Sequence, residues 1–155
     1  MRYWLMKSEP ADCSIDDLAG MPDQTVAWYG VRNYQARNFM RDTMQVGDLA
    51  FFYHSSCPQP GIAGFVQIVS TAYPDATQFD PASRFFDSKS DPERPRWLNV
   101  DVKFECKLEL ISLSVLRQHQ ELASMRVLQP ANRLSITPVT FDEWNFVLEI
   151  LARRA

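Results

Sequence analysis

The side chains of this sequence best suited to chemistry are aromatic rings and planar or charged hydrogen-bonding groups, which fall at expected strand ends and turns. They are Trp28, Tyr29, Tyr34, Tyr53 and Trp97, together with Lys7, Arg32, Asn33 and Arg133. This combination suits a planar heterocycle, because stacking contributes roughly 1–3 kcal/mol per base and donors or acceptors hold its edge. A base taken from a duplex must first be flipped out of the stack. Composition alone favours the plainer alternative, in which the aromatic rings fill the core.

The stretch Trp28–Asn38 supplies one wall of the pocket in this hypothesis. We expect a turn at Gly30 and then a helix to about Thr43, in which Arg32 heads the same apolar face as Met40. A guanidinium on that face needs a carboxylate, a carbonyl or a bound ligand to offset its desolvation. Periodicity leaves an internal ion pair and a ligand contact equally open for Arg32.

Catalytic and metal-binding motifs are missing from the sequence. His54 and His119 are not spaced as HExxH or HxH, and no acidic residue or cysteine lies at a metal-ligand spacing from either. The GxSxG, Walker and GxGxxG patterns are also missing. We therefore expect no catalytic residue, no metal and no cofactor. The alternative is an enzyme that acts on a base in the same pocket, with Lys7, Glu9 or His54 as acid or base.

The charge balance limits how the chain could bind nucleic acid. With a net charge of −3 and a pI near 5.3, it is too acidic to coat nucleic acid by bulk electrostatics. A local basic patch could still hold phosphates, and its candidates are Arg37, Arg41, Arg94 and Arg96, with Arg84 and Lys89 beside them. Arg37 and Arg41 also fit an ordinary solvated helix face.

Length and apolar pattern predict a single domain, residues 1–155, that does not enter a membrane. The 46% hydrophobic and 23% charged composition is typical of globular proteins. We find no apolar stretch long enough for a signal peptide or a bilayer span. Cys13, Cys57 and Cys106 are odd in number and widely spaced, which favours reduced thiols in a cytosolic or nuclear protein. A monomer is expected.

Four apolar stretches predict the strands that must position these side chains. They are Tyr3–Met6, Leu49–His54, Gly61–Val69 and Leu98–Cys106. The second and third should form an antiparallel hairpin. Gly64 indicates a bulge or a close backbone approach within it. Trp97 falls in the polar register of the last strand, so its indole either packs under a loop or faces a ligand.

Helix signals and one long connection complete the pattern. Ser14 is an N-cap for a short helix, and Thr140–Glu143 is a capping box before the final helix. The connection Tyr73–Arg96 exceeds the length of about a dozen residues above which loops are usually functional or disordered. We expect it to be ordered and folded over the sheet or the site. Its prolines leave open a third hypothesis, a segment that binds another protein.

Seven motifs follow one another along nearly the whole chain. They are Tyr3–Pro10, Trp28–Asn38, Val46–Asp48, Phe52–Ser55, Pro60–Gly64, Ser90–Trp97 and Asn132–Val139. In this order they resemble the EVE domain of the PUA-like superfamily. The resemblance implies an α+β fold, a small, twisted, mostly antiparallel PUA-like β-barrel flanked by several helices.

The resemblance also implies a non-catalytic nucleic-acid-binding module whose pocket accommodates a flipped-out, modified base. The expected base is a modified cytosine such as 5-methylcytosine in DNA, with RNA as the other candidate polymer. The residues that the resemblance places around the pocket are Trp28, Arg32, Asn33, Tyr34, Lys7, Ser8, Tyr53, His54, Ser55, Trp97, Arg133 and Leu134. It favours the ligand contact for Arg32 and makes Arg37 and Arg41 candidate backbone contacts. The implied compartment is the cytoplasm for a bacterial stand-alone domain and the nucleus in a eukaryote.

Overall fold

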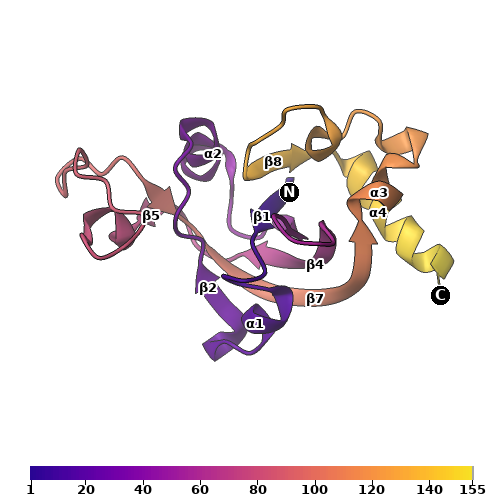
Figure 1. Cartoon of the computed structure of the whole chain (residues 1–155), viewed down its shortest axis with the longest axis horizontal. Helices are drawn as coiled ribbons and strands as arrows, with labels where there is room; N and C mark the ends of the chain where they lie inside the picture. Colours follow the sequence, from indigo (N-terminus) through magenta and orange to yellow (C-terminus); the bar gives the residue numbers. More distant parts are fainter. Residues whose placement is uncertain (155) are drawn as a thin grey trace.

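Strands and short helices alternate irregularly along the chain (Figure 1), and the computed structural model describes residues 1–154. The strands are β1 (Tyr3–Ser8), β2 (Thr25–Ala27), β3 (Leu49–His54), β4 (Gly61–Ile68), β5 (Tyr73–Pro74), β6 (Leu98–Asn99), β7 (Asp101–Ser112) and β8 (Ile136–Val139). The α-helices are α1 (Ile15–Ala19), α2 (Tyr34–Asn38), α3 (Leu113–Arg117) and α4 (Phe141–Arg154). Short 3₁₀ helices are η1 (Pro22–Gln24), η3 (Ala76–Phe79), η4 (Gln120–Leu122) and η5 (Arg126–Leu128), and η2 (Phe39–Thr43) is a π-helical turn.

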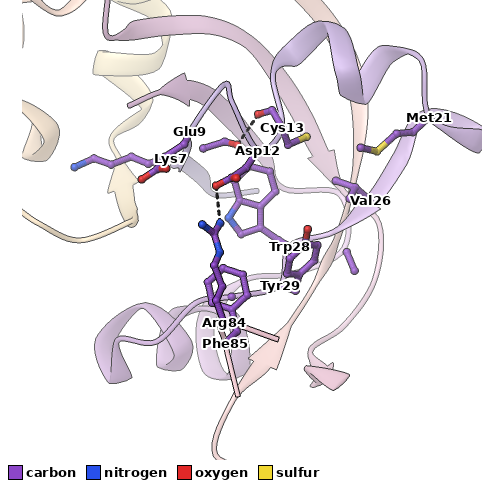
Figure 2. Close-up of a pocket in the computed structure, with 13 residues that line it drawn as sticks. Lys7, Glu9, Asp12, Cys13, Met21, Val26, Trp28, Tyr29, Arg84 and Phe85 are labelled. Atoms are coloured by element: carbon purple, nitrogen blue, oxygen red, sulfur yellow. Dashed lines mark hydrogen bonds and ion pairs between the residues drawn. The ribbon is translucent and has the colours of Figure 1, made fainter. Parts of the chain in front are cut away.

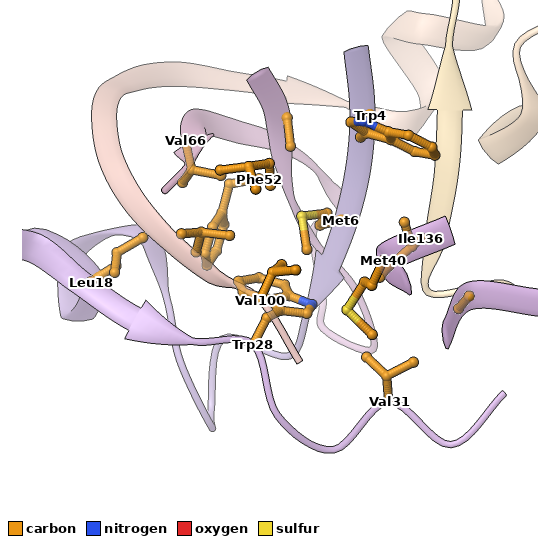
Figure 3. Close-up of a cluster of buried hydrophobic side chains, with 14 of the residues drawn as sticks. Trp4, Met6, Leu18, Trp28, Val31, Met40, Phe52, Val66, Val100 and Ile136 are labelled. Carbon is orange, nitrogen blue, oxygen red and sulfur yellow. The ribbon is translucent and has the colours of Figure 1, made fainter. Parts of the chain in front are cut away.

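The main sheet is open. Its strand order is β2-β7-β4-β3-β1-β8, only β1 and β3 are parallel neighbours within the described part of the chain, and β5 pairs with β6 separately. The α+β class and the mostly antiparallel sheet are confirmed, but the expected barrel is wrong, because the edge strands β2 and β8 do not pair across residues 1–154. Val31 and Met40, from the segment after β2, pack in one cluster with Trp28 and Ile136 (Figure 3). These side chains lie between the two edges, so packing replaces the hydrogen bonds that would close a barrel.

The hairpin of β3 and β4 has the expected irregularity at Gly64. Ala63 has no partner in β3, because the pairing moves from Gly64 to Ile62 across it. A Cβ on Gly64 would lie 2.4 Å from the carbonyl oxygen of Cys106 and 2.8 Å from Cδ1 of Ile15. Both the predicted bulge and the predicted close approach are therefore confirmed. The register between β4 and β7 also shifts twice, and β7 curves around the sheet (Figure 1).

Alternating side chains of the central strands build a separate cluster on each face of the sheet. Trp4 and Met6 of β1 pack on the face that α1 and the segment after β2 cover. Leu5 packs on the opposite face with Trp144 and Val147 of α4. The period-two pattern of a strand buried on both faces explains the continuous apolar run in β1.

The helix boundaries follow capping chemistry. The Ser14 hydroxyl accepts from the backbone N–H of Asp17, and the Thr140 hydroxyl accepts from that of Glu143, so both predicted caps are confirmed. The helix expected directly after Gly30 instead begins at Tyr34. Asn33 is extended and its side chain caps α2. Arg32 therefore lies before the helix, and the expectation that it heads the helix's apolar face is wrong.

Candidate functional site

A cavity of about 440 Å³ opens beside the end of β1 (Figure 2). Its walls come from residues 7–9 and 12–13, from Met21, from the stretch 26–30 and from the pair Arg84 and Phe85. These segments are far apart in the sequence. The cavity therefore forms only because the fold brings together the end of β1, the segment at β2 and part of the long connection. Ligand pockets commonly span about 300–1,000 Å³, so one base fits this space.

Trp28 lies at the centre of the cavity wall. Its backbone N–H donates to the carbonyl of Val100 at 2.8 Å, and its indole meets the ring of Phe52 edge-on at 5.5 Å. The side chain is 8% exposed, so most of the indole belongs to the core and only part of it faces the cavity. The core contacts hold the ring rigidly, which suits a stacking surface.

Gly30 makes the turn that follows Trp28 possible. Its φ of 85° lies in the left-handed region, and a Cβ there would lie 2.7 Å from the ring carbon Cζ of Phe85. Its backbone N–H donates to Asp75 at 2.8 Å. The turn is therefore fixed by its own conformation, by an aromatic ring and by a buried carboxylate.

The two sides of the cavity differ in polarity. Lys7 and Glu9 lie on one side of the Trp28 indole, and Met21 and Val26 lie on the other (Figure 2). Burial lowers the pKa of Lys7, because a half-buried ammonium is poorly solvated. The Lys7 ammonium points away from the Trp28 indole (Figure 2), so this side of the cavity is bordered by the Lys7 backbone and stem and by Glu9, and the other side is apolar.

Three polar groups at the cavity are already engaged. The Ser8 hydroxyl donates to the carbonyl of Cys13 at 2.6 Å. Asp12 and Arg84 form an ion pair of 2.6 Å across the cavity, between the loop after β1 and the long connection (Figure 2). Both partners are largely exposed, so this pair contributes little to stability and can exchange partners.

The structure places Arg32 in an internal network outside the cavity wall. Its guanidinium donates to Asp75 at 3.0 Å, to the carbonyl of Phe85 at 2.8 and 3.1 Å, to that of Val31 at 2.9 Å and to the Thr77 hydroxyl at 3.1 Å. Burial acts to raise the pKa of Asp75, but hydrogen bonds from Gly30, Thr77 and Arg32 outweigh it and leave that pKa below its usual value. Of the two alternatives for Arg32, the internal ion pair is the one present.

Asn33, Tyr34 and Trp97 also lie away from the cavity wall. Asn33 caps α2, and the ring of Tyr34 stacks on Trp97 with centroids 4.8 Å apart. Trp97 is 6% exposed and its indole N–H donates to Asp87 at 2.8 Å. The indole packs under the long connection, which is one of the two roles that its register allowed.

The remaining predicted pocket residues lie elsewhere too. Tyr53 is buried in the cluster on the opposite face of the sheet. The His54 ring accepts from the backbone N–H of Ile15 at 3.2 Å, and burial lowers its pKa. The N–H of Ser55 donates to the carbonyl of Ser8 at 2.9 Å, so Ser55 holds the strand end at which Ser8 lines the cavity. Arg133 is exposed and Leu134 half-buried, and neither lines the cavity.

The arginines predicted to contact phosphates differ in whether their guanidinium groups already bind other groups of the protein. Arg37 donates to the carbonyl of Arg96 at 2.9 Å, and Arg41 pairs with Asp42 at 2.8 Å. The guanidinium of Arg96 lies 4.0 Å from a carboxylate of the long connection, and Arg94 is exposed. Arg84 is the basic residue of this group that borders the cavity.

Of the twelve predicted pocket residues, Lys7, Ser8 and Trp28 line the cavity. Other residues that line the cavity were not predicted, because their side chains are short or apolar or because their segments carry no motif. They are Asp12, Cys13, Met21, Val26, Ala27 and Phe85. The sequence did contain a signal for Asp12 and Cys13, because the Ser14 cap marks the end of the loop after β1 in which both residues lie. Tyr29, one of the aromatic residues that the sequence analysis singled out, borders the cavity with its side chain half exposed.

The described residues hold neither a cluster suited to a metal ion nor a helix suited to a membrane. Across residues 1–154, no group of three or more His, Cys, Asp or Glu side chains is placed to hold a metal ion. Within the same residues, no helix has the length and apolar character needed to cross a membrane.

Comparison with known proteins gives consistent matches over the whole fold. The family model of the EVE domain matches residues 2–150. Human thymocyte nuclear protein 1 is 45% identical over an alignment of 166 residues, which covers 96% of this chain and 73% of that protein.

Two solved structures are similar as well. A crystal structure of a Pseudomonas syringae protein has a TM-score of 0.91 at 48% identity, covering 96% of this chain and 98% of that one. The crystal structure of human THYN1 in complex with 5-methylcytosine-containing DNA has a TM-score of 0.91 at 43% identity, covering 97% of each chain. The matching sequence model, the relatives and the shared fold agree, and this chain belongs to the EVE domain family.

Proposed function

We propose that this chain is a DNA-binding module that holds a flipped-out modified cytosine in the cavity beside Trp28. The observation that carries the proposal is the cavity itself, lined by a rigid indole and by a polar strand end, in a chain 43% identical to a human protein crystallised with 5-methylcytosine-containing DNA. The cavity volume of about 440 Å³ suits one base. Stacking on Trp28 offsets part of the few kcal/mol that flipping costs.

The proposed roles follow from where each side chain lies. Trp28 supplies the stacking face, the Ser8 hydroxyl, which donates to Cys13, accepts a hydrogen bond from the base, and Lys7 borders the cavity at the same strand end. Arg84 exchanges Asp12 for a phosphate beside the flipped nucleotide, which the exposure of this ion pair permits. Exposed Arg94 adds a contact to the backbone of the strand.

Several predicted pocket residues receive a supporting role in this proposal. Arg32 holds the turn at Gly30 through Asp75, and Tyr34 with Trp97 anchors the long connection over it. These contacts keep the cavity in shape before DNA arrives. Preorganisation of this kind lowers the cost of ordering side chains on binding.

The module acts without chemistry, as one unit and as a monomer. Lys7 and Glu9 are the candidate acid or base groups that border the cavity, whereas the acceptor nitrogen of His54 is engaged by α1. Incubation of the protein with methylated oligonucleotide should leave the mass of the DNA unchanged. The location we propose is the nucleus in a eukaryotic cell and the cytoplasm in a bacterial one.

Binding to labelled oligonucleotides tests the proposal directly. Fluorescence anisotropy would compare otherwise identical DNA strands carrying cytosine, 5-methylcytosine or 5-hydroxymethylcytosine, and the RNA strand of the same sequence. We expect tightest binding to a modified DNA strand. Equal affinity for modified and unmodified strands contradicts the modified-cytosine proposal, and tightest binding to RNA contradicts the choice of polymer.

Replacement of Trp28 separates stacking from general attraction. Trp28→Phe keeps an apolar ring in the core but removes part of the stacking surface, whereas Trp28→Ala would cost about 3–5 kcal/mol of stability. Trp28→Phe should reduce the preference for the modified strand, with a melting temperature that shows a folded protein. Trp144→Phe on the opposite face is the matched control.

A further inference from the structure

A second hollow, of about 490 Å³, adjoins the cavity beside Trp28 and is more open to solvent. The residues that line both spaces form the partition between them, and they are Asp12, Tyr29, Arg84 and Phe85. Beyond this partition, the walls of the second hollow come from the loop after β1 and from the long connection, through Ala11, Thr77, Asp80 and Ser83. Two spaces of base size therefore lie next to each other.

We infer that the second hollow holds the base next to the flipped one on the same strand, with Tyr29 as its stacking surface. The inference rests on the proposed function, because it needs a flipped base in the first cavity and a phosphate at Arg84. Along a DNA strand, one phosphate separates each base from the next. Along this surface, Arg84 separates one base-sized space from the next. The protein then recognises two nucleotides rather than one.

Tyr29 has a ring face to offer to a base. Its side chain is 52% exposed, and the one ring that pairs with it in residues 1–154 is that of Phe85, at an interplanar angle of 69°. Tyr34 is as exposed, at 50%, but Trp97 stacks on it and the guanidinium of Arg37 lies 4.7 Å from its centroid. An aromatic ring that no other ring covers is suited to stacking on a base of any sequence.

Arg84 is held between the two spaces. Its guanidinium carbon lies 4.7 Å from the centroid of the Phe85 ring, and its tip reaches Asp12 at 2.6 Å (Figure 2). The side chain is 63% exposed, so a phosphate can approach it from solvent. A guanidinium over a ring keeps its N–H donors free for a phosphate while the ring fixes its position.

The charges of the second hollow suit a base better than a phosphate. Its walls carry the carboxylates of Asp12 and Asp80 against the single guanidinium of Arg84. Carboxylates repel a phosphate, but they accept hydrogen bonds from the amino groups of bases. The hydroxyl of Ser83 accepts from the backbone N–H of Phe85 at 3.1 Å and keeps its own hydrogen to donate. We therefore assign the hollow to a base and the exposed side of Arg84 to the phosphate.

The wall from the long connection is fixed by its own hydrogen bonds. The N–H of Ser83 donates to the carbonyl of Asp80 at 3.0 Å, and the N–H of Phe86 donates to the carbonyl of Ser83 at 3.1 Å. The carboxylate of Asp80 also accepts from the N–H of Ala82 at 2.9 Å. The hollow thus has its shape before a strand binds, which lowers the cost of binding.

Single DNA strands with one abasic site test the inference. Each strand carries one 5-methylcytosine, and its neighbour on the 5′ or the 3′ side either keeps its base or is abasic. An abasic site retains the sugar and the phosphate, so the difference in affinity reports the base alone. By fluorescence anisotropy, we expect the abasic site on one of the two sides to weaken binding about tenfold.

Variants of Tyr29 connect this loss to the second hollow. Tyr29→Leu removes the ring, so the abasic effect on the sensitive side should fall to about twofold or less, while the effect on the other side stays the same. Tyr29→Phe keeps the ring and should keep the tenfold effect. Phe141→Leu removes a ring that is 64% exposed on α4 and lines neither space, so it should also keep this effect. Melting curves check that each variant is folded.

The contrary outcomes keep the inference apart from the proposed function. The inference is overturned if neither abasic site weakens binding by the unsubstituted protein, or if Tyr29→Leu retains the tenfold effect. It is also overturned if Tyr29→Leu lowers the abasic effect equally on both sides, because one side chain in one hollow contacts one neighbour. In each case a preference for 5-methylcytosine over cytosine leaves the proposed function standing. Equal affinity for these two bases in complete strands overturns the proposed function itself.

Discussion

Nη1 of Arg32 lies 3.0 Å from a carboxylate oxygen of Asp75, and this carboxylate is fully buried. The pair joins the turn before α2 to the start of the long connection, two segments that are 43 residues apart. Asp75 also accepts from the backbone N–H of Gly30 in that turn. The two residues therefore hold one wall of the cavity without touching its interior.

Arg32→Gln should lower the free energy of unfolding by about 3–5 kcal/mol, the usual cost of breaking a buried ion pair. The loss arises because Asp75 is left buried and charged with fewer donors. Urea denaturation measures it. Arg41→Gln breaks an exposed pair with Asp42 and should cost at most about 1 kcal/mol. Equal losses in the two variants would show that Arg32 is not structural.

Two glycines with positive φ offer a matched comparison of backbone strain and steric overlap. Gly30 has a φ of 85° and a Cβ there would overlap the Phe85 ring, whereas Gly47 has a φ of 99° and a Cβ there would meet open space. Gly47→Ala should cost about 1–2 kcal/mol for the backbone alone. Gly30→Ala should cost clearly more, because Phe85 must move, and it should also weaken DNA binding. Melting curves with binding titrations check both effects, and similar costs would show that Phe85 yields freely.

Stability should fall as the pH drops below about 6.5, the ordinary pKa of histidine. Burial lowers the pKa of His54 in the folded state, against the opposing charges of Asp16 and Asp17, so the unfolded chain binds its proton first. Linkage then favours unfolding as pH falls through this range, until the folded-state pKa is passed. Protonation also removes the acceptor that holds the N–H of Ile15. Denaturation at several pH values measures the slope.

His54→Gln supplies the control for this pH effect. Its amide oxygen can accept from α1 but does not titrate in this range. The slope between pH 7 and pH 5 should therefore flatten in the variant. An unchanged slope would assign the pH dependence to another group. Asp75, whose pKa is depressed, loses its contribution only at pH values below about 3.8.

Arg84→Gln should weaken binding to every DNA strand by a similar factor and reduce the dependence on salt. The reason is that a phosphate contact attracts any sequence and releases counterions. Titrations at several salt concentrations give the slope of log affinity against log salt, which should shrink by about 1. Arg126→Gln, at an exposed position on η5, is the control. Loss of binding to the modified strand alone would place Arg84 at the base instead.

The sequence made the local elements predictable. Continuous apolar runs located β3 and β4, and the side chains of Ser14 and Thr140 marked two helix starts that the structure confirms. The bulge at Gly64 was predictable as well, because a glycine inside a strong strand indicates a position where a side chain would not fit. These features depend on residues a few positions apart. The ordered motifs were also enough to indicate the EVE domain family, which the family model confirms.

Tertiary structure alone decided which side chains meet. The sequence left Arg32 with either a ligand or an ion pair, and only the approach of Asp75, 43 residues away, settled its partner. The same long-range packing buried Trp97 under the connection and brought Met21 to Trp28. It also left the sheet open, because the side chains of Val31 and Met40 fill the place of a closing strand pair. Periodicity assigns a residue to a face, but the partner on that face depends on the whole path of the chain.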